Sequence, residues 1–371
     1  MQSKIATYIR NNTTWREDFK SLSIHISEDD HFIIFNYDAG CDFSNELVQE
    51  ARGIILDKET LEVACWPFRK FANSHEPYAD DIDWATARVQ SKLDGSICKV
   101  WFNKYTQQWQ WSSNSIIDAR NCNISPLVKS FYDAITKTDN YKDIAFEALD
   151  KDRTYIFELV GPYNKVVINY DTPHLYHIGT RSNSTGAEYN CYIPTRPGAD
   201  WISKPEEYPL HSFNECIAAV ETLNKTDVVE HEGFVVVDAN WHRIKIKSPE
   251  YLFYHHLRTG VLSKSNAIKF LQSDDVDIEN LINNFPEYED MIHFYQSEIK
   301  RVEDEITEIV TKVRAEYDGD RRAIAAKYKT NKYSCFIFWG LDDFNRTTKE
   351  LIAHCLFSSY LNYIRDYTEV N

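Results

Sequence analysis

The chain has 371 residues, of which 43% are hydrophobic and 26% charged, and its formal net charge is −16. This composition excludes wholesale disorder, collagen-like repeats and a multi-span membrane protein, and the length predicts two or three domains. The acidic balance argues against non-specific coating of nucleic acid, although a basic cleft can lie inside an acidic body. Because no signal peptide is recognisable and the eight cysteines are scattered, we expect a cytoplasmic protein with reduced thiols and no membrane association.

Short strands dominate the predicted elements up to about residue 250. Segments rich in β-branched and aromatic residues, several with alternating polarity, predict strands at 31–37, 51–57, 89–103, 107–113, 154–160, 165–170, 175–180, 232–238 and 242–248. Helical interludes are predicted at about 127–149 and 212–223. Because strands and helices do not alternate regularly, we expect mixed or antiparallel sheets packed against helices.

Helical patterns replace the strand patterns after about residue 250. Apolar residues between 291 and 317 recur at steps of three and four, and further helices are predicted at about 320–330 and 346–366. A coiled-coil dimer is the alternative for 291–317, but about three and a half heptads favour packing within a monomer. The predicted fold class is therefore α+β, with a sheet domain at residues 1–255 and an all-helical domain at 256–371.

The sharpest local motif is KLDGS, at residues 92–96, which lies inside a predicted strand. On a strand, Lys92 and Asp94 would share one face. A KxDG match alone is weak, since a surface lysine before a turn explains it equally well. It gains weight from further charged residues within apolar strands, because such residues are costly to bury unless they are paired or bind a ligand. These residues are Arg52, Glu158, Glu232, Lys245 and Lys247.

Together, these residue types suit covalent nucleotidyl transfer through a lysine. A lysine amine is nucleophilic only when neutral, and nearby cations such as Lys245, Lys247 and a metal ion favour that form. Lysines can also offset the charge that develops on an α-phosphate in the transition state. A carboxylate such as Glu232 can hold Mg²⁺, which neutralises the pyrophosphate leaving group.

The order of these motifs resembles the covalent nucleotidyltransferase superfamily of ligases and RNA-capping enzymes. Most closely it resembles the ATP-dependent RNA ligase 1 family typified by T-even bacteriophages. Order and spacing agree over about residues 30–255, and the segments that carry the resemblance are ARGII (51–55), RKFANSHEP (69–77), KLDGS (92–96), FELVGPYNKVVINY (157–170), EGFVVV (232–237) and IKIKS (244–248). The resemblance implies a ligase-type nucleotidyltransferase domain at 1–255 and a helical domain at 256–371 that selects the RNA.

The resemblance also assigns roles to matching positions. Lys92 would be the nucleophile that carries AMP, with Asp94 orienting or assisting it. The other implied contacts are Gly95 with the nucleotide, Arg52 and Glu158 with the ribose, Ile178 with adenine, Lys70 with the outgoing phosphates, Glu232 with Mg²⁺ or Mn²⁺, and Lys245 and Lys247 with the α-phosphate.

The implied reaction uses ATP to join 5′-phosphate and 3′-hydroxyl RNA ends through a lysyl-AMP and an RNA-adenylate. Cleaved tRNA is one expected substrate, in RNA repair. The alternatives are another covalent nucleotidyltransferase, such as a DNA ligase or a capping-type enzyme, and a catalytically inactive RNA-binding relative. DNA ligases and capping enzymes usually carry an OB-type barrel after the KxK strand, whereas a helical pattern follows here.

Two further features concern the RNA. Where the family tends to place a lysine between the KxDGS and FE motifs, this sequence reads WSSNS at 111–115, so the role of that strand is open. The helical domain contains a basic stretch that is a candidate for contacting RNA phosphates, with a solvated helix face as the alternative. Its residues are Arg321, Arg322, Lys327, Lys329 and Lys332.

Overall fold

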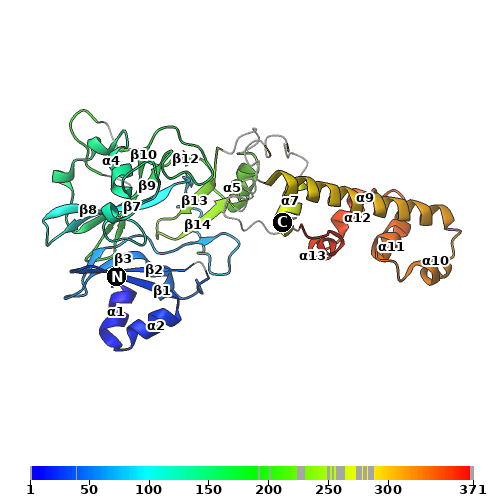
Figure 1. Cartoon of the computed structure of the whole chain (residues 1–371), viewed down its shortest axis with the longest axis horizontal. Coiled ribbons are helices and arrows are strands. Elements are labelled where there is room, and N and C mark those ends of the chain that lie inside the picture. Colours follow the sequence, from blue (N-terminus) through cyan, green and yellow to red (C-terminus); the bar gives the residue numbers. More distant parts are fainter. Residues whose placement is uncertain are drawn as a thin grey trace. The chain divides into compact units, whose positions relative to one another are not determined.

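The structure is a computed structural model that describes residues 2–38, 40–190, 193–199, 202–223, 230–248, 251–252, 255, 264–272, 278, 282 and 288–367. The chain divides into two compact units, Met1–Leu252 and Phe253–Asn371. The predicted domain boundary falls between residues 255 and 256, and residue 256 lies outside the described residues. All the strands that the structure describes lie in the first unit, and the described elements of the second unit are helices, which confirms the predicted α+β class (Figure 1).

Three sheets build the first unit (Figure 1). The first has the order β1-β2-β3-β4, with bounds Ile24–Glu28, Phe32–Tyr37, Arg52–Asp57 and Val63–Cys65. The second has the order β11-β10-β9-β7-β8, with bounds Glu188–Tyr189, His174–Ser182, Arg153–Val160, Ser96–Asn103 and Gln108–Ser112. The third has the order β12-β6-β13-β14-β5, with bounds Glu207–Tyr208, Arg88–Ser91, Gly233–Val237, Arg243–Lys247 and Ala72–Asn73. Among these strands the β5–β14 pair is parallel and the other pairs are antiparallel.

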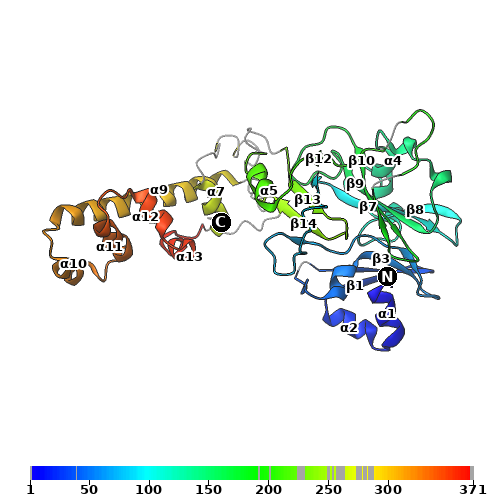
Figure 2. The same cartoon turned by 180° about the vertical axis from the view of Figure 1, so that it is seen from behind.

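Helices cover one face of each sheet. The described α-helices of this unit are α1 (Lys4–Asn11), α2 (Trp15–Ser21), α3 (Glu46–Glu50), α4 (Phe131–Thr136) and α5 (Phe213–Val220). Short 3-10 turns lie at η1 (Ala119–Asn121), η2 (Tyr141–Asp143) and η3 (Phe146–Ala148). In both views α1 and α2 lie on the side of the first sheet away from the other two sheets (Figures 1 and 2).

The apolar run in β2 has a double role. Ile33 and Phe35 pack with residues of α1 and α2, whereas Phe32 and Ile34 pack in a cluster with Trp101 of β7. A strand that is buried on both faces is continuously apolar rather than alternating, which explains the sequence FIIF. The first sheet therefore lies between its helices and the second sheet.

Alternation in the third sheet places charged residues on one face. Phe234 and Val236 of β13 pack with residues of α5, as do Ile244 and Ile246 of β14. Because successive side chains of a strand point to opposite faces, Lys245 lies on the other face of the sheet and points away from this core. The face of the third sheet that carries Lys245 is therefore available to line a pocket.

Two of the predicted strands differ from the structure. Residues 89–103 do not form one strand: β6 belongs to the third sheet and β7 to the second, and residues 92–95 cross between them. Lys92 and Asp94 therefore do not share a strand face, and that part of the prediction is wrong. Residues 165–170 form no strand either. Two backbone amide groups of this segment donate hydrogen bonds to Asp94 and not to a neighbouring strand.

The second unit packs around one long helix. Its described helices are α7 (Lys264–Leu271), α9 (Glu289–Glu316), α10 (Arg321–Tyr328), α11 (Ser334–Asp342), α12 (Thr348–His354), α13 (Phe357–Tyr360) and η5 (Leu361–Tyr363). Val302 and Ile306 of α9 are buried against residues of α11 and α12, which include Phe336 and Leu351. The apolar face of α9 is thus covered within the unit, as predicted. None of the helices that the structure describes is long and apolar enough to cross a bilayer.

The basic stretch of the second unit is largely neutralised by neighbouring acids. Arg321 forms an ion pair with Asp342, Lys327 with Glu316, and Lys332 with Glu305. These side chains are about half exposed, so each pair is accessible to solvent and to salt. An RNA phosphate at this surface would compete with carboxylates that are already in place.

Candidate active site

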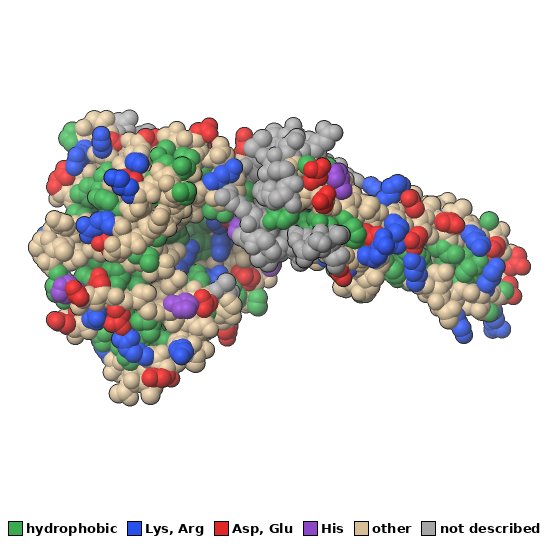
Figure 3. Space-filling model, viewed as in Figure 1, with side chains coloured by type: hydrophobic (Ala, Val, Ile, Leu, Met, Phe, Trp, Pro, Cys, Tyr) green, Lys and Arg blue, Asp and Glu red, His purple; other side chains and the backbone are tan. Residues whose placement is uncertain are grey.

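A pocket of about 490 Å³ opens in the first unit. Its walls come from the first sheet (Arg52), the second (Ser96, Glu158, Ile178) and the third (Val235, Lys245), together with the crossing segment at 92–95. The space-filling view shows a hollow in this unit with Lys and Arg side chains inside it (Figure 3). Residues that are far apart in the sequence thus meet in one concave, positively charged site.

Lys92 lies at the point where the chain leaves β6. Its backbone N–H donates to the carbonyl oxygen of Gly233 at 2.8 Å. Its Nζ lies 2.6 Å from Oε2 of Glu232, and Nζ of Lys247 lies 2.8 Å from Oε1 of the same carboxylate. One buried carboxylate, 2% exposed, therefore bridges two lysines. In this arrangement the amine of Lys92 is engaged by a carboxylate.

The pKa of Glu232 reflects this bridge. Burial works to raise the pKa of Glu232, but the ammonium groups of Lys92 and Lys247 outweigh burial and hold it below its ordinary value. The carboxylate is therefore ionised at neutral pH and available to cations.

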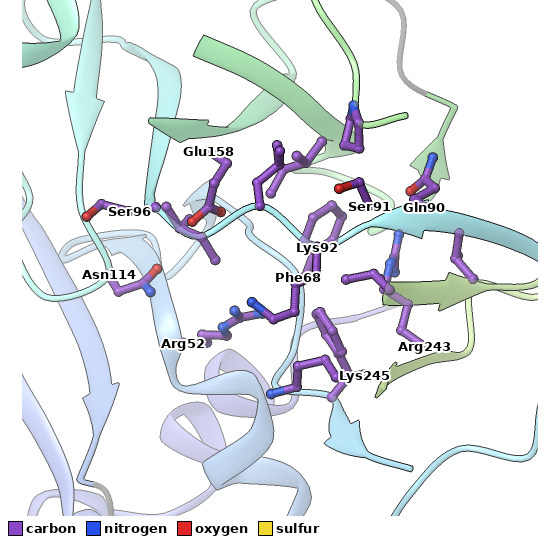
Figure 4. A pocket seen from close by; sticks show the side chains of 18 of the residues that line it. Arg52, Phe68, Gln90, Ser91, Lys92, Ser96, Asn114, Glu158, Arg243 and Lys245 are labelled. Carbon is purple, nitrogen blue, oxygen red and sulfur yellow. The ribbon is translucent and has the colours of Figure 1, made fainter. Parts of the chain in front are cut away.

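Glu158 behaves in the opposite way. It lies on β9 between the core residues Phe157 and Leu159, and its side chain points to the pocket (Figure 4). Burial raises the pKa of Glu158 to about 8, although Lys92 and Arg52 act against the shift. Near neutral pH this carboxyl is mostly protonated, so it can donate a hydrogen bond as well as accept one.

Lys245 is the third titratable group of the pocket. Burial lowers the pKa of Lys245 to about 7, and the nearby cations Lys70, Arg52 and Lys92 act in the same direction. Figure 4 shows the side chains of Arg52, Lys92, Lys245 and Glu158 around one open region. This concentration of cations suits a polyphosphate ligand, because each phosphate would offset the repulsion among them.

Asp94 lies outside the pocket lining, and its carboxylate contacts distant parts of the chain. Its Oδ2 accepts hydrogen bonds from the backbone N–H groups of Val167 and Ile168, both at 2.7 Å. Its Oδ1 accepts one from the hydroxyl of Tyr251 at 2.7 Å. The carboxylate is 3% exposed, and no hydrogen bond or ion pair joins it to Lys92 among the described residues. This geometry favours an indirect role, in which Asp94 fixes the crossing segment that carries Lys92.

The remaining predicted residues divide into two groups. Gly95, Ile178 and Lys247 line the pocket. A Cβ at Gly95 would lie 2.3 Å from the carbonyl oxygen of Leu159, so only glycine allows this approach of the segment to β9. Lys70 does not line the pocket, and its Nζ lies 4.0 Å from the centre of the Phe43 ring.

Several pocket residues were missed by the sequence analysis. Phe68 and Phe71 flank the predicted Lys70 and form apolar walls, and Trp241 contributes another. Asn114, in the WSSNS segment, also lines the pocket, and its Oδ1 is buried without a hydrogen-bond partner in the described part of the chain. Lys99, behind the pocket, is fully buried. A signal for Lys99 exists in the sequence, since it is a single charge within the apolar run ICKVW.

The carboxylates of the site fit the expected magnesium ion in a limited way. Mg²⁺ is commonly bound by one or two carboxylates plus substrate phosphates. Glu232 is ionised and lies next to Glu158, whose pKa it raises by its charge. No group of three or more His, Cys, Asp or Glu side chains suited to a metal occurs among the described residues. The residues present therefore fit an ion that shares its coordination with phosphate oxygens.

We expect ATP binding to take up protons through Lys245. With a pKa of about 7, this amine is mostly neutral at pH 8, and a bound phosphate would favour its charged form. In a Lys92→Ala background, which prevents turnover, titration calorimetry at pH 8 in buffers of different ionisation enthalpy should show proton uptake. Lys245→Met should abolish it. Lys104→Met removes an exposed lysine paired with Asp57 outside the pocket and should preserve it; equal uptake in all three proteins would contradict the assignment.

Comparison with known proteins gives the family. The model of the T4-type RNA ligase 1 family, described as RNA ligase, matches residues 50–251, more than half of the chain. An RNA ligase of Rhodothermus phage RM378 is 26% identical over an alignment of 352 residues, and the match covers 75% of this chain and 78% of that protein.

Other similarities are partial. A protein of Autographa californica nuclear polyhedrosis virus, named for polynucleotide kinase and RNA ligase activities, is 28% identical over 258 residues. That match covers 64% of this chain but 35% of the viral protein, so the chain spans about a third of the length of that relative. A solved archaeal ATP-dependent RNA ligase matches 76% of this chain and 72% of its own, with 12% identity and a TM-score of 0.44. By the match over residues 50–251, the chain belongs to the T4-type RNA ligase family.

Proposed function

We propose that this protein is an ATP-dependent RNA ligase that forms a covalent AMP adduct on Lys92. The observation that carries the proposal is the position of Lys92 at the pocket, 2.6 Å from Glu232, with Lys245, Lys247 and Arg52 around it. A lysine nucleophile, a carboxylate for the metal and cations for phosphates are thus gathered in one site. Membership of the RNA ligase family supports the same activity.

The first step is adenylation of the enzyme. Lys92 must leave Glu232 and lose a proton before its Nζ can attack the α-phosphorus of ATP. A bond forms between Nζ and phosphorus, the bond to the bridging oxygen of the β-phosphate breaks, and pyrophosphate leaves. Lys245 and Lys247 would offset the charge on the α-phosphate. A magnesium ion, when bound at Glu232, supplies further charge neutralisation for the leaving group.

Two transfers to RNA complete the cycle. An oxygen of the RNA 5′-phosphate attacks the AMP phosphorus, and Lys92 leaves as the amine. The 3′-hydroxyl of the second end then attacks the activated 5′-phosphorus, a phosphodiester forms and AMP leaves. Arg52 and the protonated Glu158, which both lie near Lys92 in Figure 4, would hold the nucleotide ribose through both steps.

The helical unit is proposed to select the RNA, for example a cleaved tRNA in a repair reaction. The residues assigned to nucleotidyl transfer all lie in the first unit, which leaves the second unit, Phe253–Asn371, without a part in the chemistry. The family relationship and this division of the chain support the proposal.

Labelling with radioactive nucleotide tests the function. The full-length protein is incubated with Mg²⁺ and ATP or GTP labelled at the α-phosphate, and acid-stable label on the protein is measured. We expect label from ATP, which a 5′-phosphorylated RNA then removes, and joined RNA as the product. Label from GTP alone would instead support a capping-type enzyme, and transfer to DNA in preference to RNA would support a DNA ligase. Absence of label from either nucleotide would contradict the proposal.

A further inference from the structure

Lys99 is a buried lysine directly behind Arg52. It lies on β7, is 0% exposed, and forms no ion pair with a carboxylate in the part of the chain that the structure describes. Its Nζ donates a hydrogen bond to the carbonyl oxygen of Gly53 at 2.7 Å. Burial lowers the pKa of Lys99 to about 8. Burying an amine is costly, and Val or Ile would suit this strand position better if packing were its only purpose.

The backbone of Gly53 is shaped around this amine. Asn36 on β2 pairs with Arg52 and Phe35 pairs with Ile54, so Gly53 is the extra residue of a β-bulge. It has φ +86°, and a Cβ there would lie 2.4 Å from Nζ of Lys99 and 2.7 Å from the carbonyl oxygen of Asn114. Arg52 and Gly53 therefore dock closely on β7 and on the segment after β8.

The register of the second sheet connects Lys99 with the missing lysine of the WSSNS segment. Lys99 pairs with Ser112 across the β7–β8 ladder. The strand β8 lacks the lysine of the family, and the neighbouring strand β7 carries one directly opposite. Lys99 does not line the pocket, however, whereas Arg52 and Asn114 do. Figure 4 shows Asn114 beside Arg52 at one side of the pocket. The positive charge of the β7–β8 pair, on Lys99, thus lies outside the pocket lining and reaches the site only through the backbone of Gly53.

We infer that Lys99 is a positioning residue: by holding the carbonyl of Gly53, its amine fixes Arg52 in the geometry that binds ATP. The inference rests on the proposed function, since it concerns the same pocket. Arg52 begins β3 at the rim of the first sheet, and its side chain is long. When the backbone of Gly53 is fixed, the Arg52 side chain has fewer conformations available. Less conformational entropy is then lost when it binds a ligand, and binding is stronger.

A double-mutant cycle separates positioning from packing. The proteins are wild type, Lys99→Met, Arg52→Ala and the double variant, and the measurement is the rate of self-adenylation as a function of ATP concentration. We expect Lys99→Met to raise the half-saturating ATP concentration by about 10-fold, with a much smaller change in the maximal rate. Because Lys99 acts through Arg52, the double variant should be no worse than Arg52→Ala alone.

Val100→Ala provides the matched control. Val100 is equally buried on the same strand, but it packs into the core on the other face of the sheet. This variant should lower the melting temperature and leave the half-saturating ATP concentration unchanged. If Lys99→Met is unstable at the assay temperature, all the proteins are compared at a lower temperature at which this variant is folded.

The inference is overturned if a folded Lys99 variant binds ATP like the wild type, or if its effect adds fully to that of Arg52→Ala. Failure of the proposed function looks different, because the wild-type protein would then form no lysyl-AMP at all.

Discussion

Lys92→Ala should abolish self-adenylation. An alanine has no nucleophile, and the other lysines of the pocket are assigned to phosphate contacts rather than attack. Sealing of a strand that already carries a 5′-adenylate should stay within a few-fold of the wild-type rate, because that step needs no lysyl-AMP. The measurements are acid-stable label from α-labelled ATP and single-turnover ligation of the pre-adenylated RNA.

Lys92→Arg is the control that separates charge from nucleophilicity. An arginine can keep an ion pair with Glu232, but a guanidinium is not deprotonated at neutral pH and forms no phosphoramidate. We expect no label from this variant either, together with a melting temperature closer to wild type than that of Lys92→Ala. Label retained by both variants would show that another residue is the nucleophile.

Glu232→Gln should have the second largest effect, lowering the adenylation rate by about 100-fold or more at saturating ATP. The amide keeps the shape of the side chain but cannot neutralise Lys92 and Lys247 or serve a metal ion, and such charge stabilisation contributes several kcal/mol. The structure also predicts a loss of stability, since the substitution leaves two lysines, each about a fifth exposed, without their counter-ion. We expect a decrease of about 1–3 kcal/mol in the free energy of unfolding, below the value for fully buried pairs.

Asp238→Asn controls for the loss of a buried carboxylate. Glu232 precedes β13 and Asp238 follows it, and Asp238 is 1% exposed. Its oxygens accept hydrogen bonds from the backbone N–H groups of Asp83, Asn240 and His242, and none of these residues lines the pocket. Asp238→Asn should lower stability while the adenylation rate of the folded protein is retained. A normal rate in Glu232→Gln, with stability lost, would mean that Glu232 has a purely structural role.

The sequence predicted the parts of this site that local patterns encode. Glu158 and Lys245 were found because a charge within an alternating apolar strand is conspicuous, and the structure places both at the pocket. Lys99 carries the same signal, but it belongs to none of the motifs that predict the site. The motifs that carry the family resemblance lie on either side of this residue and do not include it.

Other features depend on contacts that no local pattern contains. Residues 89–103 have the alternation of one long strand, and only the pairing partners decide that β6 and β7 belong to different sheets. The partners of Asp94 are 73, 74 and 157 positions away in the chain. The two- and three-residue strands β4, β5, β11 and β12 are too short to show any period. These features follow from tertiary packing, which hydrophobic periodicity does not describe.

The ion pair between Lys92 and Glu232 also has a consequence for an enzyme that waits for its substrate. A permanently neutral amine in an open pocket would react with aldehydes and other electrophiles that diffuse into it. Paired with Glu232 at 2.6 Å, the amine of Lys92 is not free to attack such molecules. Arrival of a nucleotide and a cation that competes for the carboxylate would release it. The reactivity of Lys92 thus depends on whether a nucleotide occupies the pocket. Without a nucleotide, side reactions of this lysine are suppressed.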